Sequence, residues 1–254
     1  SMLWNSGEDK MIKGLILSLQ FFTRIPINIS VDFNQKNIRY SIFFMPLAGA
    51  ITGGLGGLIY YLLVPYNKLV ASFLALLVTI ILTGGLHIDG LSDTFDGFMA
   101  CKDKEETMKI MKDSRIGVFG VLSIILLLIF KFILIISIKN LPLAMTLSFA
   151  NSRLVLGPII SYKKTARSNG LGSLFHNSKP KKLIIISTII YLIAVISLDI
   201  KYTIPLIVNY IVAEYISYIS YKKIGGLTGD VYGAIIEIGD TVSLLLFWSV
   251  MMWI

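Results

Sequence analysis

Seven long apolar runs dominate this sequence, and they decide which folds the chain can adopt. A helix needs roughly 20 residues to cross a bilayer core of about 30 Å. The runs lie near residues 40–65, 68–86, 117–138, 142–160, 183–199, 203–221 and 233–254. Their apolar residues are continuous rather than alternating, which is typical of helices rather than of barrel strands. The sequence therefore predicts an all-α, polytopic membrane helix bundle with about seven transmembrane helices.

Two shorter patterns refine this prediction. The apolar run from Leu15 to Phe22 is too short to cross a bilayer, so we expect a short N-terminal interfacial or re-entrant helix. Gly49, Gly53 and Gly57 recur every four residues in the first run, which favours close helix packing inside the protein over a dimer contact. Without a linker or long repeat, residues 1–254 are expected to form a single integral-membrane domain.

Basic residues are distributed unevenly between the loops. Of the 23 lysines and arginines, 18 lie in segments 1–39, 87–116, 161–182 and 222–232, and the intervening loops carry three. Cytoplasmic loops are enriched in such residues, so we expect a multi-pass protein of the cell membrane whose long loops face the cytoplasm. The net charge of +8 is then explained by contact with membrane lipid, and no nucleic-acid partner is expected.

An acidic motif in the loop 87–116 is the strongest indication of chemistry. Asp89, Asp93 and Asp96 are spaced i, i+4 and i+7, so a helix here would bring the three carboxylates to one face. Like charges this close repel one another unless a cation lies among them. Oxygen ligands suit Mg²⁺, and we therefore predict that these three aspartates bind Mg²⁺ as the cofactor.

Other polar residues lie in the loops expected on the same side. Asp113 and Arg115 precede the third run, and an arginine there can clamp a phosphate. His87 is a candidate for a base or a substrate contact. The candidate catalytic residues are Asp96, His87, Asp113 and Arg115, and the candidate substrate-binding residues are Arg24, Asn151, Arg153, Arg167, Thr228, Asp230, Glu237 and Asp240.

Four charged residues fall inside predicted spans, where charges are costly and usually face a cavity or a partner. Arg153, Glu214, Glu237 and Asp240 are expected at similar depths near the cytoplasmic boundary, in one polar pocket. The alternative is a structural ion pair of Arg153 with Glu214 or Glu237. Lys131 is expected to extend toward the other face of the membrane.

The motifs, taken in order, resemble those of the cobalamin synthase, or adenosylcobinamide-GDP ribazoletransferase, family. The resemblance rests on the segments 21–26 (FFTRIP), 84–97 (GGLHIDGLSDTFDG), 111–117 (MKDSRIG) and 225–230 (GGLTGD), which extend over nearly the whole chain. One departure is Asp240, where a glutamate would be expected.

This resemblance implies a Mg²⁺-dependent enzyme at the cytoplasmic membrane. It would join adenosylcobinamide-GDP to α-ribazole, or to its 5′-phosphate, and release GMP. Asp96 is then the first choice as base, with another carboxylate or His87 as alternatives, and the arginines would offset phosphate charge. Small-molecule substrates are the expected partners besides lipid, and a homo-oligomer is compatible with the pattern.

Two other functions fit parts of the sequence. A CDP-alcohol phosphotransferase also has an aspartate-rich site at the membrane edge, but its usual Asp-Gly-x-x-Ala-Arg core is absent from Asp89 to Thr94. An ion-coupled transporter would explain the acidic residues within spans. The acidic residues gather near one face, however, and inverted repeats are not apparent.

Overall fold

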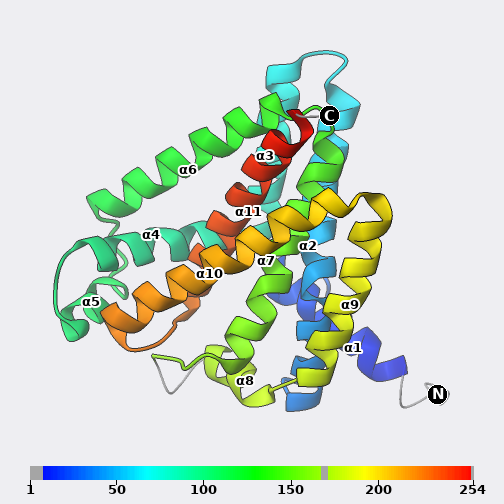
Figure 1. The fold of residues 1–254 in the computed structure, drawn as a ribbon. Helices are drawn as coiled ribbons and strands as arrows, with labels where there is room; N and C mark the ends of the chain where they lie inside the picture. The colour runs from blue at the N-terminus through cyan, green and yellow to red at the C-terminus, as the bar shows by residue number, and fades with distance from the viewer. Residues whose placement is uncertain (1–7, 167–170, 253–254) are drawn as a thin grey trace.

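The predicted all-α bundle is confirmed by a computed structural model that describes residues 8–166 and 171–252 (Figure 1). No strand is found in these two ranges. The helices are α1 (Glu8–Phe22), α2 (Gln35–Leu63), α3 (Lys68–Thr83), α4 (Leu86–Met99), α5 (Lys104–Ile110), α6 (Val118–Ser137), α7 (Leu141–Tyr162), α8 (Leu171–Ser178), α9 (Lys181–Leu198), the 3₁₀ turn η1 (Ile200–Tyr202), α10 (Thr203–Ile224) and α11 (Gly229–Met252).

Six helices in the described ranges are long and apolar enough to cross a membrane, which agrees with the predicted bundle. They are α2, α6, α7, α9, α10 and α11, with η1 included in the span of α10. A seventh span is counted only if α3 and α4 are taken together, and these two helices meet at 86°. The run 68–86 is therefore not one straight helix, because it ends at Thr83 and the chain turns sharply.

Two glycines make the corner between α3 and α4. Gly84 and Gly85 have φ angles of 63° and 70°, in the left-handed region that favours glycine. The Arg24 side chain also covers Gly84, since a Cβ atom there would lie 2.6 Å from Arg24 Cγ. The corner turns α4, with its three aspartates, nearly perpendicular to α3.

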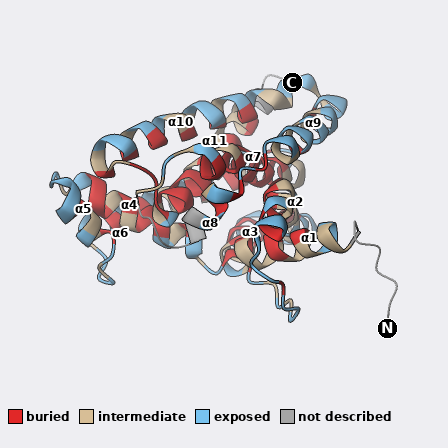
Figure 2. Cartoon of the chain, turned by 90° about the horizontal axis from the view of Figure 1, so that it is seen from below, coloured by how far each residue is buried: buried red, intermediate tan, exposed pale blue. Residues whose placement is uncertain are grey.

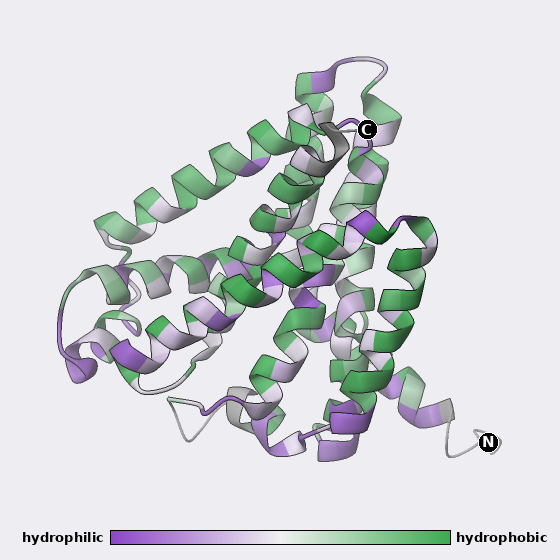
Figure 3. Ribbon diagram, in the orientation of Figure 1, coloured by the Kyte–Doolittle hydropathy of each residue, from purple (hydrophilic) through white to green (hydrophobic). Residues whose placement is uncertain are grey.

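The bundle places its less apolar helices in the middle. In α7, 83% of the most apolar stretch is buried, compared with 11% in α9. Figure 2 shows buried residues concentrated on α4, α7 and α11, whereas Figure 3 shows α6 and α9 as almost uniformly hydrophobic. The helices that face outward are thus suited to lipid, and the polar side chains of α7 and α11 are turned toward one another.

Close packing of α2 against α7 explains the glycine repeat. A Cβ atom at Gly49 or Gly53 would collide with the backbone oxygen of Phe149 or Met145, and one at Gly57 would lie 2.6 Å from Pro142 Cα. All three glycines therefore face α7 of the same chain. The interpretation as internal helix packing is confirmed.

Candidate functional site

The segment with the acidic motif is helical, but its three aspartates do not share one environment. Asp89 is exposed and Asp93 half-buried, whereas Asp96 is buried. The Asp96 carboxylate accepts hydrogen bonds from the backbone amides of Gly117 (2.7 Å) and Gly120 (2.8 Å). Asp96 thus caps the N-terminal end of α6, where unpaired amides and the helix dipole favour a negative charge.

A polar pocket of about 310 Å³ lies beside the other two aspartates. It brings together residues from the start and the end of the loop that was predicted to carry the chemistry. Its lining residues are Asp89, Ser92, Asp93, Met111, Lys112, Asp113, Ser114, Arg115, Ile116 and Ile124. Of the candidate residues in this loop, Asp89, Asp93, Asp113 and Arg115 line this pocket, and His87 and Asp96 do not.

Asp113 and Arg115 form a bidentate ion pair at the rim of this pocket. Arg115 Nε and Nη2 donate to the two carboxylate oxygens of Asp113 at 3.0 and 2.7 Å, and the Arg115 side chain is 87% exposed. The hydrogen bonds from Arg115 lower the pKa of the Asp113 carboxyl to about 2. Asp113 is therefore ionised at neutral pH, and the guanidinium is oriented at the pocket mouth, where it can reach an anionic ligand.

The oxygen atoms of this pocket are of the kind that Mg²⁺ binds. No set of three or more His, Cys, Asp or Glu side chains in the described parts of the chain is arranged to hold a metal ion. Mg²⁺ usually takes only one or two carboxylates, together with waters and substrate phosphates. Asp89 and Asp93 line the pocket and fit that smaller requirement, whereas Asp96 does not line it.

A second, largely apolar cavity of about 220 Å³ adjoins Asp89 from the other side. Helices α1, α4, α7, α8 and α11 contribute to it. Its lining residues are Phe21, Phe22, Leu86, His87, Asp89, Gly90, Leu156, Ile160, Phe175, Gly229, Asp230, Tyr232, Gly233 and Ile236. Asp89 lines both this cavity and the polar pocket, so one residue borders both spaces.

Glycines let α4 and α11 approach each other beside the cavity. A Cβ atom at Gly90 would lie 2.7 Å from the Asp230 backbone oxygen, and one at Gly233 would lie 3.0 Å from the His87 oxygen. Thr228 is buried and donates to Asp230 Oδ2 at 3.3 Å. The motif 225–230 therefore brings Asp230 next to the acidic helix, as its predicted place in the site requires.

The charged residues within the spans form a separate, interior network. Glu237 accepts from Lys131 Nζ at 2.5 Å, and Asp240 accepts from Arg153 Nη1 at 2.5 Å. Lys131 Nζ also lies 3.9 Å from Asp240, and all four side chains are nearly fully buried. None of them lines the polar pocket or the apolar cavity beside Asp89.

Two expectations about these residues, those for Lys131 and Glu214, were wrong, and the alternative ion pair of Arg153 forms with a different partner. Lys131 points inward rather than toward the outer face, because Glu237 and Asp240 on α11 attract it. Arg153 pairs with neither Glu214 nor Glu237, since Asp240 is in contact with it. Glu214 lies apart from the network and pairs with Lys163 at 2.7 Å.

The remaining candidate residues have other environments. Asn151 is buried, accepts from the Tyr191 hydroxyl at 2.6 Å, and belongs to the interior of the bundle. Arg24 is exposed and lies over the α3–α4 corner. Arg167 falls outside the described residues.

Sequence reasoning did not identify Lys112, Tyr232 or the aromatic pair Phe21 and Phe22 as part of either space. Lys112 and the phenylalanines lie within motifs that were recognised, so their proximity to the acidic residues was a usable signal. Tyr232 had no such signal apart from its position between Asp230 and Gly233.

Comparison with known proteins identifies the family. The family model described as cobalamin-5-phosphate synthase matches residues 14–248. An adenosylcobinamide-GDP ribazoletransferase of Treponema denticola is 38% identical over 92% of this chain and 96% of its own length. Proteins of the same name from Clostridium botulinum (39%; 93% and 97%) and Thermoanaerobacter pseudethanolicus (36%; 94% and 98%) are similar over equally large parts. No solved structure matches. This chain therefore belongs to the cobalamin-5-phosphate synthase family.

Proposed function

We propose that this chain is a multi-pass membrane enzyme that joins adenosylcobinamide-GDP to α-ribazole, or to its 5′-phosphate, and releases GMP. The observation that carries the proposal is that a charged, oxygen-rich pocket and an apolar cavity share Asp89. A transferase for these two substrates has to hold a diphosphate and an aromatic nucleoside with their reacting atoms together. The two adjoining spaces match these two chemical requirements.

The reaction is an in-line phosphoryl transfer. A ribose hydroxyl of the ribazole attacks the phosphorus joined to the cobinamide, and a new P–O bond forms. The P–O bond to the GMP half breaks, so GMP leaves with the bridging oxygen. In this proposal Asp230, at the wall of the apolar cavity, accepts the hydroxyl proton, because Asp96 lines neither of the two spaces.

The charged groups of the polar pocket would position the diphosphate. Arg115 and Lys112 offset phosphate charge, and Arg115 exchanges its Asp113 contact for phosphate oxygens. Asp89 and Asp93 would hold Mg²⁺, which would supply electrostatic stabilisation of the charge that develops during transfer. Asp96 holds the start of α6, and so the loop with Asp113, against α4.

We further propose that both spaces open toward the cytoplasm. The polar pocket is formed by the loop between α4 and α6, one of the four segments that together carry 18 of the 23 basic residues. Positive charge of this kind is retained on the cytoplasmic side.

The test measures GMP and cobalamin production by purified protein supplied with adenosylcobinamide-GDP, α-ribazole and Mg²⁺. Asp89→Asn and Asp93→Asn are expected to abolish GMP release, because each replaces a carboxylate that would hold Mg²⁺ on the diphosphate. Asp103→Asn is the matched control, since Asp103 caps α5 through Glu106 N and asparagine caps equally well. Full activity of either pocket variant would refute the assigned site.

The same assay separates the alternative functions. A CDP-alcohol phosphotransferase would release CMP from CDP-activated substrates and leave adenosylcobinamide-GDP unused. A transporter reconstituted in vesicles would accumulate the corrinoid without forming GMP.

A further inference from the structure

We infer that the apolar cavity beside Asp89 is the binding site for the benzimidazole base of the ribazole and that Tyr232 recognises the free ring nitrogen of that base. This inference rests on the proposed function and assigns one part of the substrate to one part of the site. Its basis is the size, lining and buried polar atoms of the cavity.

The size of the cavity restricts its occupant to a fragment of the substrates. Sites for drug-sized ligands usually have volumes of about 300–1,000 Å³. A cavity of about 220 Å³ is smaller, so neither the corrin ring nor a whole nucleoside diphosphate fits into it. A fused bicyclic base is of suitable size.

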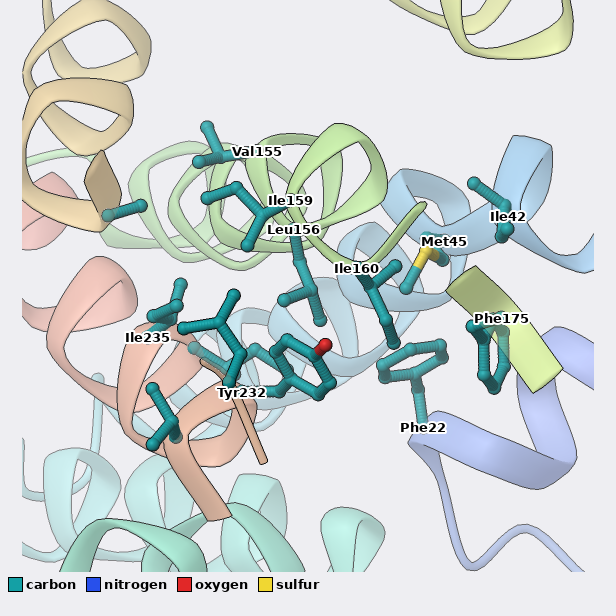
Figure 4. Packing of buried hydrophobic residues seen from close by; sticks show 14 of the residues in the cluster. Phe22, Ile42, Met45, Val155, Leu156, Ile159, Ile160, Phe175, Tyr232 and Ile235 are labelled. Carbon is teal, nitrogen blue, oxygen red and sulfur yellow. The ribbon is translucent and has the colours of Figure 1, made fainter. Parts of the chain in front are cut away.

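The lining favours a flat and apolar fragment. Phe22 and Phe175 form one side with Ile160, and Figure 4 shows these side chains converging from α1, α8 and α7. Aromatic and branched side chains stabilise a flat ring by stacking and by burial of its surface. Burial of the two methyl groups on the dimethylbenzimidazole base of α-ribazole would stabilise the bound base in the same way.

Two buried polar atoms on the cavity-lining residues have no hydrogen-bond partner. They are the Tyr232 hydroxyl and His87 Nε2, and each residue is 5% exposed. Figure 4 shows the Tyr232 hydroxyl directed toward Phe22 and Ile160, on the cavity side of α11. An unpaired buried hydroxyl is costly, and a ligand that accepts a hydrogen bond there removes the cost. A benzimidazole riboside has one free ring nitrogen, which is an acceptor of this kind.

The guanine of the GDP half is the competing occupant. Guanine carries several donors and acceptors on its edges, and burying them without partners costs free energy for each group. The side chains that line the cavity offer these two buried atoms and the carboxylates of Asp89 and Asp230 at its wall. Dimethylbenzimidazole leaves fewer groups unsatisfied, so the observations favour it.

The experiment measures binding by calorimetry to wild-type protein in detergent, without turnover. The ligands are α-ribazole, its analogue with an indole in place of the benzimidazole, and adenosylcobinamide-GDP. Tyr232→Phe removes only the hydroxyl and is expected to weaken α-ribazole binding about two- to tenfold, the worth of one hydrogen bond. Its affinity for the indole analogue and for adenosylcobinamide-GDP should be unchanged.

Tyr66→Phe is the matched control, because Tyr66 is 86% exposed in the loop between α2 and α3. Weaker binding of adenosylcobinamide-GDP by Tyr232→Phe, with α-ribazole unaffected, would assign the cavity to guanine and overturn the inference. Equal affinities of wild type and Tyr232→Phe for all three ligands would also overturn it.

Activity is measured separately on the same preparations. Tyr232-dependent binding of α-ribazole by a protein that releases no GMP would support the inference and refute the proposed function. GMP release by a protein whose binding of α-ribazole does not depend on Tyr232 would support the proposed function and refute the inference.

Discussion

Replacing Lys131 by methionine isolates the energetic role of the interior network. Lys131 Nζ lies 2.5 Å from Glu237 and 3.9 Å from Asp240, and its side chain is 4% exposed. Arg153 and Asp240 form the second pair, so the four charges sum to zero. Lys131→Met keeps the length of the side chain but leaves an uncompensated negative charge in the interior of the bundle.

The expected loss of stability is about 3–5 kcal/mol, the usual cost of removing one partner of a buried ion pair. For a chain of this size, 1 kcal/mol corresponds to about 2–4 °C in Tm, so Lys131→Met should melt about 6–20 °C lower than wild type. The assay is thermal unfolding in detergent, followed by size-exclusion chromatography of the heated protein. Lys201→Met, an exposed lysine between α9 and α10, controls for the loss of one positive charge.

The double variant Lys131→Met/Glu237→Leu decides whether the network is structural. It removes both charges of one pair and leaves Arg153 with Asp240, so Tm should return close to the wild-type value. GMP release should return with it, because none of these residues lines the polar pocket or the apolar cavity beside Asp89. A double variant that is stable but has a raised KM for adenosylcobinamide-GDP would refute this reasoning and assign Glu237 to substrate binding.

Three further outcomes are expected. Gly53→Ala should lower stability by about 1–3 kcal/mol, because its Cβ atom would collide with the Met145 backbone. Gly54→Ala is the control: its Cβ atom would lie 3.4 Å from the nearest neighbour, so this variant should be neutral or stabilising in the same melting assay. Gly84→Ala should lower Tm, since φ of 63° strains an alanine. The Asp113 carboxyl should titrate near pH 2 by NMR in the wild type and near its ordinary 3.8 in an Arg115→Ala variant. Because the pKa of Asp113 is lowered in the folded state, its ion pair with Arg115 stabilises the protein above about pH 4. This stabilisation is lost as the pH falls toward 2.

Six of the seven predicted spans were predictable because each depends on local pattern. Long apolar runs have few alternatives in lipid, and a spacing of i, i+4 and i+7 is meaningful on any helix. The corner at Gly84 and Gly85 was not predicted, although two adjacent glycines at the end of an apolar run are a signal for a turn. Apolar pattern alone cannot show it, since the run 68–86 extends past both glycines to the first residue of α4.

The acidic site was predicted in part. Asp89, Asp93, Asp113 and Arg115 were expected together and do line one pocket. Asp96 shares their face by spacing, yet it is directed to the amides at the start of α6. A helical wheel gives the direction of a side chain and contains no information about which neighbouring element is there to meet it.

The interior network shows why charge inside a span has two meanings that a sequence cannot separate. A buried charge needs a counter-charge or a ligand, and both requirements place Asp, Glu, Arg or Lys in an apolar run. The choice depends on the rotation of each helix about its axis, which decides whether Glu237 meets a cavity or meets Lys131. Because Lys131 and Glu237 are 106 residues apart, only the packing of α6 against α11 settles the question. Intramembrane charges that form ion pairs within the protein should therefore be assigned to stability first, and the proposed catalytic role should be limited to carboxylates that line an open pocket, as Asp89 does.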